Sequence, residues 1–139
     1  MREILFRGKR RDTGEWAEGS LVKAKGLYTK IINGEVKNND FFDEHFIVDP
    51  ETVGQFSGIL DANGQKVFEG DIVKLTEDVK KTYRVDDGVV KFNHSAFFVN
   101  GRDGFLDSLF VLADVSYVLR GWVIGNIYDN PELLEVQHE

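Results

Sequence analysis

Short stretches in which apolar and polar residues alternate, separated by turn signals, predict a mainly β protein. In residues 3–8, the apolar Ile4 and Phe6 alternate with polar neighbours, as in a strand that buries one face. The other predicted strands are rich in Val, Ile, Phe and Tyr, which suit a pleated and partly buried surface: residues 15–25, 27–32, 35–37, 46–48, 71–75, 88–92, 96–99 and 116–123.

Turn signals recur along the chain, each pairing Asn or Asp with glycine, residues that tolerate the positive φ angles of tight hairpin turns. Most of them lie between two predicted strands, which favours antiparallel hairpins over parallel strands joined by helices. The signals are Asp12-Thr13-Gly14, Asn33-Gly34, Asn63-Gly64, Asp87-Gly88, Asn100-Gly101 and Asp103-Gly104.

Helical patterns are few. Residues 105–112 are predicted to form about two helical turns that place their apolar residues on one face. Asn130, as an N-cap, and Pro131, at the first helical position, predict a short C-terminal helix. The polar residues 76–82 are predicted to form a loop.

The pattern of predicted strands and turns changes near residues 50–54. This change divides the chain into an N-terminal β-hairpin region, residues 1–50, and a second region, residues 51–139. In the second region, Gly70-Asp71 before Ile72-Val73 is typical of the turn that leads into a small SH3-like barrel. The predicted fold is therefore mainly β, with antiparallel hairpins, an SH3-like barrel portion and a short C-terminal helix. The pattern leaves open whether the two regions share one core or have one each.

Composition narrows the possible chemistry. The chain has 139 residues and no cysteine, which excludes disulfides, zinc–thiolate sites and a thiol nucleophile. No apolar run approaches the roughly 20 residues that span a bilayer. The first residues lack the apolar region of a signal peptide, so we expect a cytoplasmic protein that does not bind membranes.

Charge is distributed unevenly along the chain. The net charge is −7 overall, but it is +4 over residues 1–37 and −11 over residues 38–139. A basic stretch formed by Arg7, Lys9, Arg10 and Arg11 could contact a phosphate backbone, although the overall negative charge opposes binding to nucleic acid. The alternative interpretation is a solvated hairpin tip.

No pattern of residues indicates a catalytic site, a metal site or a cofactor. Asp43, Glu44 and His45 are adjacent, so a strand would point them to alternating faces, and no second histidine stands at a defined spacing. Glu69 and Asp71 could share one face as a carboxylate pair, but turn formation is the simpler role. We therefore expect no catalytic residue, no metal ligand and no cofactor.

Two pairs of adjacent aromatic residues have two possible interpretations, a surface for a protein partner or a second layer of the core. Phe41-Phe42 and Phe97-Phe98 are such pairs, and alternation along a strand exposes one member of each unless both faces are covered. An exposed row of phenylalanines would be a protein–protein surface, whereas a covered one would be a second layer of the core.

Three blocks of residues, at the start, in the middle and at the end of the chain, carry a family resemblance. They are Met1-Arg2-Glu3-Ile4-Leu5-Phe6-Arg7-Gly8-Lys9-Arg10 with Gly14-Glu15-Trp16 and Glu18-Gly19; Asp49-Pro50-Glu51-Thr52-Val53-Gly54-Gln55-Phe56-Ser57-Gly58 with Asp61, Asn63-Gly64 and Glu69-Gly70-Asp71-Ile72-Val73; and Ile124-Gly125-Asn126-Ile127-Tyr128-Asp129-Asn130-Pro131-Glu132-Leu133-Leu134. Together they resemble the YopX family of phage and prophage proteins. The resemblance implies a β-rich fold with an SH3-like portion and a bacterial host, and it supplies neither a catalytic residue nor a cofactor.

The leading prediction is a non-enzymatic phage or prophage accessory protein that acts by protein–protein contact, including self-association. The alternative is a nucleic-acid-binding module that uses Arg7, Lys9, Arg10 and Arg11. A third interpretation, a hydrolase built on Glu69 and Asp71, requires both carboxylates to lie in a pocket.

Overall fold

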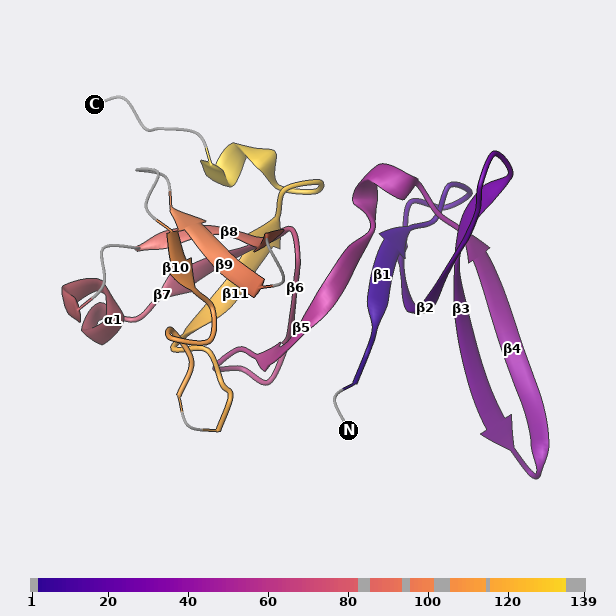
Figure 1. The fold of residues 1–139 in the computed structure, drawn as a ribbon, viewed down its shortest axis with the longest axis horizontal. Helices are drawn as coiled ribbons and strands as arrows, with labels where there is room; N and C mark the ends of the chain where they lie inside the picture. Colours follow the sequence, from indigo (N-terminus) through magenta and orange to yellow (C-terminus); the bar gives the residue numbers. More distant parts are fainter. Residues whose placement is uncertain (1–2, 83–85, 94–95, 102–105, 115, 135–139) are drawn as a thin grey trace. The chain divides into compact units, whose positions relative to one another are not determined.

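The computed structural model describes residues 3–82, 86–93, 96–101, 106–114 and 116–134. The chain divides into two compact units, Met1–Phe56 and Ser57–Glu139, and each has its own cluster of buried apolar residues. Both units are built mainly from antiparallel strands, which confirms the predicted β class (Figure 1).

The first unit is an antiparallel sheet with the strand order β4-β3-β2-β1, extended by the first residues of β5 next to β1. Its core consists of Ala17, Ile31 and Val48, against which Phe46 and other apolar residues pack. The elements are β1 (Phe6–Lys9), β2 (Trp16–Ala24), β3 (Tyr28–Lys37), β4 (Asp40–Ile47), the 3-10 helix η1 (Pro50–Thr52) and the start of β5 (Gly54–Leu60).

The hairpin of β3 and β4 turns at a different place from the predicted one. Asn33-Gly34 was predicted as the turn, but both residues lie within β3, and the chain reverses at Asn38 and Asn39. These two asparagines have φ angles of 52° and 67°, as in the two-residue turns that match the twist of a hairpin. Within β3, Gly34 leaves room for the ring of Phe41, since a Cβ atom at this position would lie 2.8 Å from the ring.

The second unit contains an antiparallel sheet with the strand order β10-β9-β8-β7-β11. Its core is larger, with fully buried residues such as Ile72, Leu112 and Leu119. No helix in the described ranges is long and apolar enough to cross a membrane. The elements are the end of β5, β6 (Lys66–Phe68), β7 (Asp71–Leu75), the helix α1 (Glu77–Thr82), β8 (Asp87–Asn93), β9 (Ala96–Gly101), β10 (Leu106–Ser108), β11 (Gly121–Asn126) and the 3-10 helix η2 (Pro131–Leu134).

Several predictions for the second unit need correction. Residues 106–108 form β10, because pairing with β9 outweighs the local helical pattern. Residues 77–82 form α1 instead of a loop, since Val79 is buried and the charges at its two ends suit the helix dipole. The described strand pairings do not close into a barrel, so the SH3-like detail is not confirmed. The predicted C-terminal helix is also not confirmed, because residues 131–134 form a 3-10 helix and residues 135–139 lie outside the described ranges.

Asp61 organises the turn between β5 and β6, and Asn63-Gly64 lies in this turn as predicted. The residue is 1% exposed, yet its carboxylate is well satisfied. One oxygen accepts the N–H groups of Asn63 and Gln65, and the other accepts the N–H group of Val123 in β11 at 3.0 Å. This buried carboxylate therefore joins a turn to a strand 62 residues away in the sequence.

A matched pair of substitutions tests this role. Asp114 accepts the N–H groups of Ser116 and Val118 at the same sequence spacing, but its side chain is exposed. We predict that Asp61→Ala lowers the free energy of unfolding by about 2–3 kcal/mol, because it leaves buried N–H groups without an acceptor. Asp114→Ala should cost no more than about 0.5 kcal/mol. Urea unfolding checks both values, and an equal loss in the two variants would contradict the assignment.

Candidate functional site

The basic stretch of the sequence is divided between buried and exposed positions in the first unit. Arg7 is 8% exposed, and its guanidinium lies 4.5 Å from the centroid of the Trp16 ring. Lys9 approaches the same ring, with its Nζ atom 5.7 Å from the centroid. Arg7 and Trp16 face each other across β1 and β2, so this cation is used in packing and is largely inaccessible to a large ligand.

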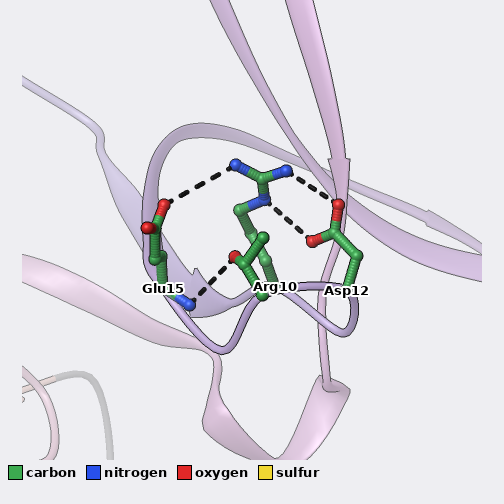
Figure 2. A network of polar contacts seen from close by, with 4 residues as sticks. Arg10, Asp12 and Glu15 are labelled. Atoms are coloured by element: carbon green, nitrogen blue, oxygen red, sulfur yellow. Dashed lines mark hydrogen bonds and ion pairs between the residues drawn. The ribbon is translucent and has the colours of Figure 1, made fainter.

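Arg10 is held by two carboxylates of its own turn. Its Nε and Nη2 atoms donate hydrogen bonds to Asp12 at 3.0 and 2.7 Å, and its Nη1 atom lies 3.9 Å from Glu15 (Figure 2). The guanidinium also lies 4.6 Å from the centroid of the Phe46 ring. The hydrogen bond with Asp12 raises the pKa of Arg10 and lowers the pKa of Asp12. The positive charge of Arg10 is therefore balanced locally.

Arg11 remains available, and it lines a groove of about 390 Å³. The groove is lined by the turn after β2 and by the end of β4. Arg11 lies beside the end of β4, since its N–H group donates to the carbonyl of Ile47 at 3.0 Å. Two more cations, Lys23 and Lys25, line it, together with exposed apolar residues such as Leu27. Among the described residues that line the groove there is no carboxylate. We call this feature the basic groove.

The three cations of the basic groove have no partners within the described part of the chain. The side chains of Arg11, Lys23 and Lys25 form no hydrogen bond or ion pair there, and all three residues are exposed. Sequence analysis identified Arg11 but missed the two lysines, because they are 12 or more residues away from it along the chain. The available signal was two lysines, two residues apart, next to Gly26 in a tight turn.

The other prominent surface of the first unit is the far end of the β3–β4 hairpin. Pairing of β3 with β2 ends at Ile32, whereas pairing of β3 with β4 continues to Lys37 and Asp40. Residues 33–44 therefore form a two-stranded ribbon, which Figure 1 shows as the lower end of the hairpin and which we call the arm. Every arm residue whose side chain is described is exposed, including Phe41 at 67% and Phe42 at 54%.

Two of the residues that sequence analysis considered as metal ligands, Asp43 and His45, contact each other instead. His45 Nε2 lies 2.5 Å from Asp43 Oδ2, and its Nδ1 lies 3.0 Å from Lys30 Nζ. Both ring nitrogens of His45 are therefore occupied, and Glu44 lies on the opposite face of the strand. Among the residues that the structure describes, no three His, Asp or Glu side chains gather closely enough to hold a metal ion.

The two carboxylates considered as a catalytic pair, Glu69 and Asp71, lie at the turn between β6 and β7. Asp71 is 1% exposed, and its Oδ2 atom accepts the N–H group of Phe68 at 2.8 Å. Because Phe68 ends β6 and Asp71 begins β7, this bond stabilises the turn between the two strands. Glu69 lies within that turn and is partly exposed.

The Arg10 network makes a prediction about pH. Since the hydrogen bond from Arg10 lowers the pKa of Asp12, Arg10→Gln should raise that pKa towards its ordinary value of 3.8. The stability contributed by the pair is present above the unfolded-state pKa of Asp12 and is lost as the pH falls through its folded-state pKa. NMR titration of the Asp12 carboxyl in the wild type and in Arg10→Gln measures this pKa. Identical pKa values in the two proteins would show that the pair does not form in solution.

The comparisons with known proteins cover almost the whole chain. The crystal structure of protein EF1440 from Enterococcus faecalis is similar, with 26% sequence identity and a TM-score of 0.61, over 97% of this chain and 100% of that one. No curated protein matches the chain. The family described as YopX protein matches residues 5–135. These residues include most of each of the three blocks, and the chain belongs to the YopX family.

Proposed function

We propose that this protein is a phage or prophage accessory protein of the bacterial cytoplasm, which acts by protein–protein contact and not by catalysis. The observation that carries the proposal is the arm, where Phe41 and Phe42 are exposed on opposite faces of a two-stranded ribbon. The resemblance of the three sequence blocks supports the phage or prophage context.

Binding of a protein partner would stabilise the arm. A two-stranded hairpin is at best marginally stable by itself in water, because it has little apolar surface to bury. Two exposed phenylalanine side chains so close together add an unfavourable contact with water. A protein partner that covers the arm would remove both costs, and aromatic side chains are enriched at such contacts.

The edge of the arm favours a specific partner over general aggregation. β4 is the last strand of its sheet, so its outer backbone groups can pair with another chain. The strand carries Asp40, Asp43 and Glu44, and charges of this kind discourage uncontrolled pairing of exposed edges. A partner of this surface therefore has to satisfy the carboxylates as well as cover the phenylalanines.

A pull-down with a matched control tests the proposal. The tagged protein is incubated with lysate of the native host, with and without nuclease treatment, and retained proteins are identified by mass spectrometry. We predict that the double variant Phe41→Ser, Phe42→Ser loses most of a partner that the wild type retains. Phe110→Ser should keep it, because Phe110 is 65% exposed but lies in the second unit.

Two outcomes would contradict the proposal. One is a partner that binds the wild type and the arm variant equally well, since the contact would then lie elsewhere. The other is retention that disappears after nuclease treatment, which would favour the nucleic-acid interpretation. Circular dichroism of both variants verifies that they are folded.

A further inference from the structure

The arm and the basic groove have complementary charge and complementary apolar content. On β4, Asp40, Phe42 and Glu44 alternate with other residues and therefore share one face. Asp40 and Glu44 form no hydrogen bond or ion pair with any residue that the structure describes. This face presents a carboxylate, an exposed aromatic ring and a second carboxylate in succession.

The basic groove presents the matching features. Its lining combines the three cations Arg11, Lys23 and Lys25 with apolar side chains, of which Leu27 is 81% exposed and Ile47 is 45% exposed. Carboxylates would satisfy the cations, and an aromatic ring would cover the apolar lining. A nucleic acid would satisfy only the cations, since Tyr28 is the one aromatic residue among the described lining residues and Lys30 Nζ already lies 4.7 Å from the centre of its ring.

We infer that the basic groove of one copy of this protein receives the Asp40–Phe42–Glu44 face of the arm of a second copy. The inference rests on the proposed function in taking the arm as the contact element, and it names the partner and the surface that the arm meets. The groove and the arm lie at opposite ends of the β3–β4 hairpin, so each copy offers both halves of the contact. Two such contacts can form at once in a symmetric dimer.

The net charge of −7 on each copy opposes self-association but does not prevent it. At physiological ionic strength the Debye length is about 8 Å, so distant charges are largely screened and those in contact dominate. The contact is therefore local, and we expect it to weaken as salt is added.

A charge-swap experiment tests the inference by sedimentation velocity over a range of protein concentrations. The groove variant, Lys23→Glu with Lys25→Glu, and the arm variant, Asp40→Lys with Glu44→Lys, should each self-associate about tenfold or more weakly than the wild type. An equimolar mixture of the two should associate again, because each acidic groove then meets a basic arm. Lys74→Glu with Lys91→Glu changes the same charge in the second unit and should have no effect.

The inference is overturned if the wild type is monomeric at every concentration, or if the mixture of variants does not associate. Binding of a short oligothymidylate that the groove variant loses, without self-association of the wild type, would instead identify a nucleic-acid interface. The wild type could be monomeric while the variant Phe41→Ser, Phe42→Ser still loses a host partner. That result would refute this inference alone and leave the proposed function intact. Should a variant fail to fold, the salt dependence of wild-type association decides, and association that does not weaken with salt overturns the inference.

Discussion

The register of the β3–β4 hairpin determines what the first unit presents to its surroundings. The turn at Asn38 and Asn39 pairs Lys37 with Asp40 and, further along, Ile31 with Phe46 at the core. A turn at Asn33-Gly34 would instead have ended the hairpin beside β2 and left no arm. Because side chains alternate along a strand, the same register places Phe42 between two carboxylates on one face.

Several polar positions of the family blocks are buried and have structural roles. Asp61, Asp71 and Asn126 are buried, and their side-chain oxygens accept backbone N–H groups in turns. Asn130 similarly accepts the N–H group of Asn126, at 3.2 Å. Unpaired backbone groups are costly to bury, so these residues specify the turns of the second unit.

Local patterns predicted the fold class and several turns, because hairpin chemistry is encoded in adjacent residues. Gly14 and Gly64 both have the positive φ angles that their turns require. The prediction failed at Asn33-Gly34, because the turn forms at Asn38-Asn39, which has no glycine. It also failed at Asp87-Gly88 and Asn100-Gly101, which lie within β8 and β9. The residues of β10 were misjudged because their conformation depends on pairing with β9, which a local window does not contain.

The candidate site could be predicted only in part, for a geometric reason. Arg7, Lys9, Arg10 and Arg11 are adjacent in the sequence, but the strand and the following turn direct them into three different environments. The basic groove combines Arg11 with two lysines from another strand and its turn, so no continuous motif contains it. Strand alternation predicted that one member of the Phe41-Phe42 pair is exposed, whereas the structure exposes both.

Hydrogen–deuterium exchange at low and high protein concentration tests the central claim, that the arm is a contact surface, most directly. The amides of residues 33–44 lie in a ribbon that is marginal without a partner. Our account predicts that they exchange more slowly as the concentration rises, while those of the second unit, such as β7 and β8, are unchanged. Exchange in the arm that is equally fast at every concentration, with or without host lysate, would contradict it.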